Sequence, residues 1–384
     1  MKGTELDKIM NKRIASPVPL GSYPPDDVTF LLKDLSDVSL ERATAEREEA
    51  IQSGVHYSEM LPVEYQPTAQ YIELFHETLQ QSAEKVARAV AVVSEMIVAQ
   101  RGTENTVLVS LARAGTPIGV LIRRYIAERY GVNLPHYSIS IIRGKGIDEN
   151  AILYMLQQHG TDAKLQFIDG WTGKGAIRRV LIEACSSMYQ KYGILLSDDL
   201  AVLADPGHCS ATFGTREDYL VPSACLNSTV SGLMSRTVLR DDLIGPEEFH
   251  GAKFYKEWLE EDLSNVFIEA ITPYYPSVME EAQAVAAGML ASPPEITWQG
   301  LRDIQSIQET FGIADINLVK PGVGETTRVL LRRVPWKILV DTMDNPNLRH
   351  ILLLAEDRGV QVEVFPGLTY SCCGIIKPLK GESE

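Results

Sequence analysis

The sequence has few cysteines and no long apolar run. Its five cysteines form no CxxC pair and no even set, which argues against a structural zinc site or a disulfide framework. No apolar segment reaches the roughly 18 to 20 residues of a membrane-spanning helix, and residues 1–19 lack the apolar core of a signal peptide. These absences predict a cytoplasmic protein without a membrane partner.

Positive charge is also scarce, because the 384 residues carry a net charge of -15. A protein that coats nucleic acid through bulk charge needs an excess of Lys and Arg, so this class is disfavoured. The acidity is uneven, however. Residues 296–384 hold 10 basic against 11 acidic side chains, and residues 1–295 hold 26 against 40. A local basic face on the C-terminal part stays compatible with this distribution.

Several catalytic signatures are missing as well. The sequence lacks the GxxxxGK[ST] spacing of a P-loop, the GxGxxG of a dinucleotide site and the HExxH of a zinc peptidase. None of the local cysteine-protease signatures occurs either. A dedicated transition-metal site is therefore not expected.

What is present is an alternation of short β-rich runs with helical segments. Apolar residues at helical spacing predict a long amphipathic helix over residues 71–99. Strand-loop-helix units follow, and their predicted strands are 106–112, 137–142, 165–168 and 200–204. Such units predict an α/β fold, a parallel sheet covered by helices on both faces, with functional loops at the strand carboxyl ends.

Pro293 and Pro294 mark a domain boundary, because two prolines end a helix and stiffen the chain. Strands and helices alternate again after them, which predicts a second, smaller α/β domain. The predicted organisation is an arm and helix over 1–65 that belong to the first domain, its body over 66–290, a linker over 291–297 and the second domain over 298–384.

The loop after the third predicted strand has the features of a phosphate site. The strand ends in Asp169, and Thr172, Gly173, Lys174 and Gly175 form a tight turn at a helix start, where backbone amides favour an anion. Asp169 would face a sugar or stabilise positive charge at an anomeric carbon. The alternative is a plain strand-to-helix turn.

This loop resembles the PRPP-binding motif of type I phosphoribosyltransferases. The resemblance implies that Asp169 is catalytic and contacts Mg²⁺ indirectly, that residues 172–175 bind the 5′-phosphate, and that the partners are PRPP and a small-molecule acceptor. Gly170 stands where that family has a second acid.

Two further loops occupy positions that this resemblance makes functional. Arg113, Ala114 and Gly115 follow the first predicted strand and are expected to bind pyrophosphate, a task that suits the fixed donors of Arg. Arg143 and Lys145 follow the second strand, at the position of a mobile flap. Each set also fits a solvent-facing basic turn.

Longer segments resemble the StiP family, in which a phosphoribosyltransferase-like domain precedes a Pelota-type RNA-binding domain. The segments that carry this resemblance are 21–35, 51–65, 109–119, 140–148, 167–177, 215–239 and 322–335. This resemblance implies a link to tellurium resistance and stress, and the making of a ribonucleoside-like compound. A homodimer is among the states that the sequence leaves open.

A polar segment follows the fourth predicted strand. Arg216, Asn227, Ser228 and Arg236 are expected to select the acceptor, although Ser and Asn residues there equally fit turn and helix caps.

Two other functions compete. StiP proteins carry a cysteine-protease label. The neighbours His208 and Cys209 would point apart, whereas Cys225 could pair with the distant His56 or His208. RNA binding is the other option, because Arg328, Arg332 and Arg333 share one face of a predicted helix. Against these, the sequence favours phosphoribosyl transfer from PRPP, with Mg²⁺, to a nucleobase-like acceptor.

Overall fold

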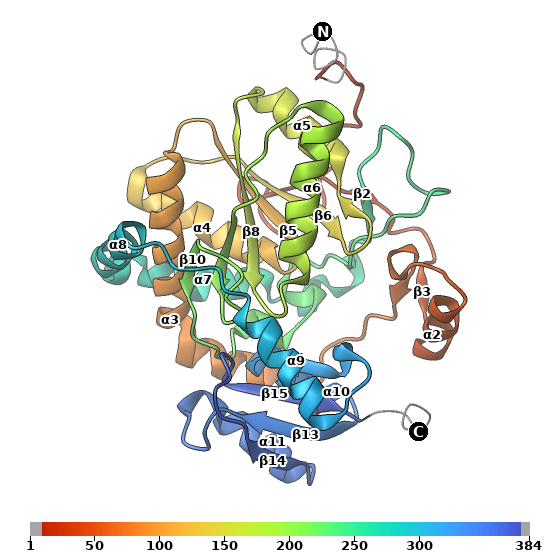
Figure 1. The fold of residues 1–384 in the computed structure, drawn as a ribbon. Coiled ribbons are helices and arrows are strands. Elements are labelled where there is room, and N and C mark those ends of the chain that lie inside the picture. Colours follow the sequence, from red (N-terminus) through yellow and green to blue (C-terminus); the bar gives the residue numbers. More distant parts are fainter. Residues whose placement is uncertain (1–9, 378–384) are drawn as a thin grey trace.

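A computed structural model describes residues 10–377, so the outer ends of both predicted domains, 1–9 and 378–384, lie outside the described residues. A parallel sheet forms the centre of the first domain (Figure 1). In spatial order its strands are β1 (Thr29–Phe30), β6 (His136–Ile142), β5 (Thr106–Ala112), β8 (Lys164–Trp171), β9 (Leu200–Ala204) and β10 (Phe213–Thr215). A short strand, β7 (Gly146–Ile147), pairs antiparallel with β6. The predicted α/β fold is confirmed.

Helices cover both faces of this sheet, as a parallel sheet requires. The helices and 3-10 turns of this domain beyond the N-terminal segment are α3 (Ala69–Arg101), α4 (Gly115–Tyr130), α5 (Glu149–His159), α6 (Ala176–Tyr192), η2 (Pro222–Cys225), η3 (Ser228–Val230), η4 (Lys256–Glu261), α7 (Ser264–Ile271), η5 (Thr272–Tyr274) and α8 (Tyr275–Ala291). Alternating strand residues separate two cores. Leu108 and Ile168 pack with α3 and α4, whereas Val109 and Phe167 pack with α5 and α6.

The N-terminal segment is more ordered than an irregular arm. Besides β1 it supplies β2 (Lys33–Asp34), which pairs with β11 (Gly251–Ala252), and β3 (Glu41–Arg42), which pairs with β4 (Leu61–Pro62). It also holds α2 (Thr44–Gln52) and η1 (Tyr57–Glu59). Local composition could not reveal these strands, because each is two residues long and depends on a partner distant in the chain.

The C-terminal domain is a four-stranded sheet with helices. Its strands, in spatial order, are β12 (Val319–Pro321), β15 (Cys372–Ile376), β13 (Pro335–Val340) and β14 (Gln361–Val364). Its helices and 3-10 turns are α9 (Gln299–Phe311), η6 (Ile316–Leu318), α10 (Val323–Arg332), η7 (Pro346–Leu348) and α11 (Arg349–Asp357). Buried Ile338 and Leu330 lie in its core. The predicted alternation of strands and helices is therefore present.

The two domains are joined by buried polar contacts. The Asp218 carboxylate accepts hydrogen bonds from the backbone N–H of Val323 at 3.0 Å and of Ser371 at 2.8 Å, and the Ser371 hydroxyl donates to the Asp218 carbonyl at 2.7 Å. Burial raises the pKa of Asp218 to about 7. The C-terminal domain thereby sits against the carboxyl ends of the central strands (Figure 1). Within residues 10–377, no helix is long and apolar enough to span a membrane.

Candidate functional site

A wide cavity of about 950 Å³, which we call the cationic cleft, lies between the two domains. The loops after β5 and β6 and the end of β8 form one wall, and β12 and α10 contribute the opposite wall. Its charged lining residues are Arg47, Glu64, Arg113, Arg143, Asp169, Arg236, Lys320, Glu325, Arg328, Arg332 and Arg333.

Cations dominate this lining by eight to three, although the whole chain is strongly acidic. Two of the eight are paired: Arg113 lies 3.5 Å from Glu64, and Arg328 lies 3.2 Å from Glu325. Among the described side chains, the other six have no carboxylate within ion-pair distance. The cleft is thus a local positive surface that total charge conceals, and it is suited to an anion with several charges.

The crowding of like charges is visible in the pKa values. Burial, reinforced by Arg113 and other nearby arginines, lowers the pKa of Arg236 to about 10. Burial also lowers the pKa of Lys320, with Arg333 and Arg143 acting in the same direction. With a pKa of about 10, Arg236 stays charged at neutral pH. A bound polyanion would relieve the repulsion, because it places an opposite charge among them.

Aromatic rings line the cleft between the cations. The guanidinium carbons of Arg143 and Arg236 lie 5.6 and 5.4 Å from the centre of the Tyr57 ring. The guanidinium carbon of Arg332 lies 4.3 Å from the centre of the Tyr71 ring. Tyr65 is 75% exposed. Cations stacked on rings together with an open ring are the elements of a surface that binds nucleic-acid strands.

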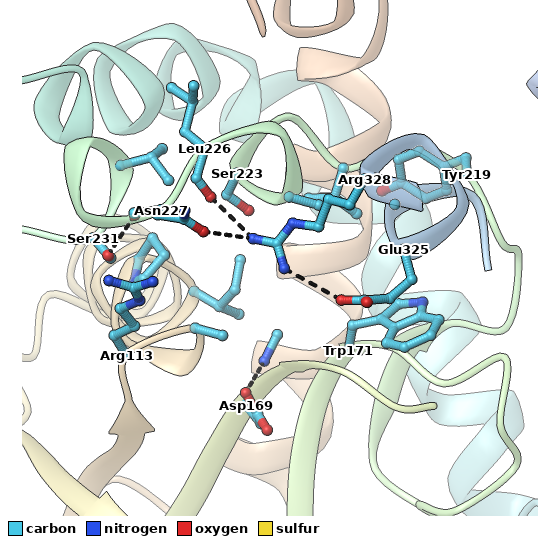
Figure 2. Close-up of a pocket in the computed structure, with 18 residues that line it drawn as sticks. Arg113, Asp169, Trp171, Tyr219, Ser223, Leu226, Asn227, Ser231, Glu325 and Arg328 are labelled. Carbon is cyan, nitrogen blue, oxygen red and sulfur yellow. Dashed lines mark hydrogen bonds and ion pairs between the residues drawn. The ribbon is translucent and has the colours of Figure 1, made fainter. Parts of the chain in front are cut away.

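A smaller cavity of about 220 Å³, which we call the side chamber, shares Arg113, Asp169, Asn227 and Arg328 with the cleft. Figure 2 shows these side chains around one space. Arg328 donates to the Asn227 side-chain oxygen at 2.8 Å, and Arg113 donates to the Met234 carbonyl at 3.1 Å. These hydrogen bonds fix the orientation of both guanidinium groups, which therefore form an ordered boundary between the cleft and the side chamber.

Asp169 lies at the end of β8, in the wall of both cavities. One carboxylate oxygen accepts the backbone N–H of Gly170 at 2.7 Å. Burial raises the pKa of the carboxyl to about 7, so a large fraction is neutral at physiological pH. A neutral carboxyl both donates and accepts hydrogen bonds.

The predicted phosphate turn, residues 172–175, lines neither cavity. The Thr172 hydroxyl donates to Asp205 at 2.6 Å, and the Lys174 ammonium donates to the carbonyls of Ile316 at 2.9 Å and Val319 at 3.3 Å. Because protein groups occupy these side chains, phosphate binding at the turn stays a prediction without support from either cavity.

The other predicted site residues divide into two groups. The structure brings together at the cavities Arg113, Ala114, Asp169, Asn227, Arg143, Arg236, Arg328, Arg332 and Arg333. Outside both cavities lie Gly115, Lys145, Arg216 and Ser228. Arg216 instead binds the buried Asp205 at 3.2 Å and donates to the Glu295 carbonyl at 2.7 Å.

Sequence reasoning missed Arg47, Tyr57 and Lys320 in the cleft, and Trp171 and Tyr219 in the side chamber. Lys320 lies two residues before the segment 322–335, so the same basic cluster gave a usable signal. Arg47 gave none, because it belongs to a charged helix that reads as a solvated surface.

The cysteines lack the environment of a nucleophile. Cys209 is fully buried and Cys225 is 1% exposed, and burial raises the pKa of each thiol to about 12. The Cys209 sulfur contacts the carbonyls of Gly173 and Gly207 at 3.7 and 3.4 Å. Within residues 10–377, no cysteine is hydrogen-bonded to a histidine. Activated thiols have lowered pKa values and some exposure, so these resemble structural cysteines.

The predicted Mg²⁺ site remains untested. Mg²⁺ is commonly held by one or two carboxylates together with ligand phosphates. Asp169 fits as one such carboxylate, but among the described residues no group of three or more His, Cys, Asp or Glu side chains is arranged to hold a metal ion. Any Mg²⁺ here would depend on oxygens of the ligand.

Comparison with known proteins decides the family. Residues 21–272 match the family described as "Tellurite-like stress resistance cysteine protease StiP". The chain belongs to the StiP family. Residues 298–378 match the PELOTA RNA binding domain. A StiP relative, named cysteine protease StiP, from Acinetobacter baylyi is 35% identical over 353 residues, which are 90% of each chain.

A solved aminotransferase from Anaerococcus prevotii aligns with 81% of this chain and 76% of its own, at 10% identity. Its TM-score of 0.21 is too low to indicate a shared fold.

These findings overturn the prediction of phosphoribosyl transfer. The StiP family and the Acinetobacter relative are named as cysteine proteases, and neither comparison supports PRPP, an acceptor base or a transferase reaction. The prediction rested on the turn at 172–175, which local sequence makes similar to a phosphate loop. In the folded chain that turn packs against the second domain.

Proposed function

We propose that the cationic cleft binds single-stranded RNA, so that this StiP-family protein acts on or through an RNA ligand. The observation that carries the proposal is the excess of eight cations over three acids in one cleft of a chain with net charge -15. A single strand fits because its backbone follows a positive groove while its bases stack on aromatic rings. Tyr65 offers an open ring for this purpose.

The match of residues 298–378 to an RNA-binding domain supports the same ligand. That domain contributes Lys320, Arg328, Arg332 and Arg333 to the cleft. The first domain contributes Arg47, Arg113, Arg143 and Arg236. RNA binding in this proposal is therefore a property of both domains together. The five free cysteines fit a reducing, cytoplasmic setting.

Fluorescence anisotropy of a labelled 12-nucleotide RNA with the full chain tests the proposal. We expect the double variant Arg143→Ala/Arg333→Ala to bind about 100-fold more weakly, since each charge-assisted contact contributes about 1.5 kcal/mol. Arg349→Ala is the matched control, because it removes an exposed arginine of the second domain outside the cleft. Equal affinity of the double variant and the control would contradict the proposal.

The family description favours a second function, cysteine peptidase. Cys225 is the candidate nucleophile, because its neighbours Ala224 and Leu226 line the side chamber. Its buried thiol, with a raised pKa, would have to become exposed before it could attack a carbonyl.

Peptidase activity on a casein substrate, with and without iodoacetamide, tests this function. A cysteine peptidase through Cys225 requires that Cys225→Ser abolish cleavage and that alkylation of the native chain occur first at this residue. Cleavage that persists in the Cys225→Ser variant would remove Cys225 from the reaction. Cys209→Ser is the comparison variant.

A further inference from the structure

The side chamber branches from the cationic cleft. The residues common to both cavities are Arg113, Ala114, Asp169, Asn227, Glu325 and Arg328. Beyond this shared rim the chamber extends between the start of α4, the end of β8 and η2. A ligand held in the cleft can therefore place one group inside the chamber.

The chamber differs from the cleft in its chemistry. Its interior is walled by apolar and aromatic side chains: Pro117, Ile118, Trp171, Tyr219, Val221, Leu226 and Val230. Its volume of about 220 Å³ lies below the roughly 300 to 1,000 Å³ of pockets that enclose a whole drug-sized ligand. The chamber thus suits one flat ring system.

Two polar groups of this apolar space are incompletely bonded. The Tyr219 hydroxyl is buried and has no hydrogen-bond partner among the described residues. The Asp169 carboxyl has one hydrogen bond, to the adjacent backbone N–H of Gly170. The Tyr219 hydroxyl is itself closed off from the chamber, whereas the partly exposed Asp169 carboxyl lines it and can pair with a ligand. Asn227 adds further polar atoms to the lining.

We propose that the side chamber binds a nucleobase of the ligand whose phosphates lie in the cationic cleft. This inference rests on the proposed function and adds a base-binding subsite to it. A base has apolar faces that pack on Ile118 and Val221, and a polar edge that pairs with Asp169. An aliphatic group would leave the Asp169 side chain without a ligand partner, which costs affinity.

The subsite requires both domains. Trp171 packs close to Gly322 at the domain boundary, because a Cβ on Gly322 would lie 2.4 Å from its ring. Gly324, Glu325 and Arg328 of α10 close the chamber from the second domain. The base would therefore be enclosed by the same docking contact that creates the cleft.

Calorimetry with mononucleotides and with ribose 5-phosphate, which lacks a base, tests the proposal on the full chain. We expect at least one of AMP, CMP, GMP and UMP to bind at least 10-fold more tightly than ribose 5-phosphate. That nucleotide should quench tryptophan fluorescence in the wild type and not in Trp171→Phe. Equal affinity for ribose 5-phosphate and all four nucleotides would overturn the proposal.

Two variants distinguish the contribution of the chamber to ligand binding from that of the cleft. Ser223→Phe fills the chamber and should weaken the preferred nucleotide at least 10-fold while leaving ribose 5-phosphate unchanged, and Ser223→Ala should behave as wild type. Arg333→Ala, which lines only the cleft, should weaken both ligands equally. If the chain bound RNA but bound all four nucleotides no more tightly than ribose 5-phosphate, only the chamber proposal would be contradicted. If the wild-type chain bound no RNA in the anisotropy assay, both the proposed function and the base subsite would be contradicted.

Discussion

Two sets of loops at the carboxyl ends of neighbouring strands differ in whether the second domain covers them. The turn 172–175 after β8 carries glycines, a lysine and a helix start, and it is covered by the second domain. The loops after β5 and β6 carry Arg113 and Arg143, and they open into the cationic cleft. Both sets occupy the position at which parallel sheets place ligands. The second domain determines which of them is available.

Contact with that domain explains the difference in physical terms. The Lys174 ammonium reaches two carbonyls in 316–319, so its charge is used internally. Arg143 has no carboxylate partner among the described side chains and stacks on Tyr57. A loop with the composition of a ligand site can therefore bind a ligand only where its hydrogen-bond donors are not already bonded to a neighbouring domain.

The largest expected effect concerns the contact that docks the second domain. Asp218→Ala leaves the N–H groups of Val323 and Ser371 without their acceptor, so we expect a loss of about 4 kcal/mol in the free energy of unfolding. Urea denaturation measures it. Asp218→Asn keeps one acceptor oxygen and should cost less. A stability unchanged in Asp218→Ala would refute the view that this contact holds the domains together.

Alanine substitutions at one glycine in each loop compare how tightly the two loops are packed. Gly175 and Gly144 both have positive φ, 75° and 77°. A Cβ on Gly175 would lie 2.3 Å from the Trp298 ring, whereas one on Gly144 would lie 3.3 Å from His56. We expect Gly175→Ala to cost about 3 kcal/mol and Gly144→Ala about 1 kcal/mol in thermal or urea unfolding. Similar costs would mean that the 172–175 turn is not tightly covered.

Two lysine variants compare the contribution to RNA affinity of a charge that lines the cleft with that of a charge covered by the second domain. Lys320→Ala should weaken RNA about fivefold, since it removes a charge that lines the cleft. Lys174→Ala should change affinity less than twofold, because its ammonium is bound to carbonyls outside the cleft. Anisotropy at one fixed salt concentration compares them. A larger effect from Lys174 would restore the 172–175 turn as a phosphate site.

The smallest effect is the pH dependence of Asp169. Its pKa near 7 exceeds the ordinary value, so the folded state retains a proton that the unfolded state releases between about pH 4 and pH 7. Its contribution to stability is therefore present below that window and falls as pH rises through it. Because Asp169 is partly exposed and solvent screens its charge, only part of this shift is expected as stability. Asp169→Asn should gain about 1 kcal/mol over wild type between pH 4 and pH 8, measured by urea unfolding. A constant difference would mean that burial does not raise this pKa.

Much of the fold was predictable from the sequence. The strand 106–112 coincides with β5 and the strand 200–204 with β9, because continuous apolar runs bounded by turns identify buried parallel strands. The helix expected over 71–99 is α3, two residues longer at each end. Two-residue strands such as β1 escaped, since they exist only through pairing with β6.

The site was predictable only in part. Arg113, Arg143 and Arg328 follow recognisable local signals and do line the cavities. The cover over 172–175 could not be foreseen, because it depends on how a second domain docks. The same holds for the cleft itself, whose cations come from segments more than 200 residues apart, such as Arg113 and Arg333.

The salt dependence of RNA affinity tests the central claim most directly. If the cleft neutralises four or five phosphates, the logarithm of affinity should fall with the logarithm of KCl concentration with a slope of about -3, since single strands give roughly -0.7 per phosphate. The Arg143→Ala/Arg333→Ala variant should flatten that slope by about 1.4. A slope near zero, or one that the double variant leaves unaltered, would contradict RNA binding by the cationic cleft.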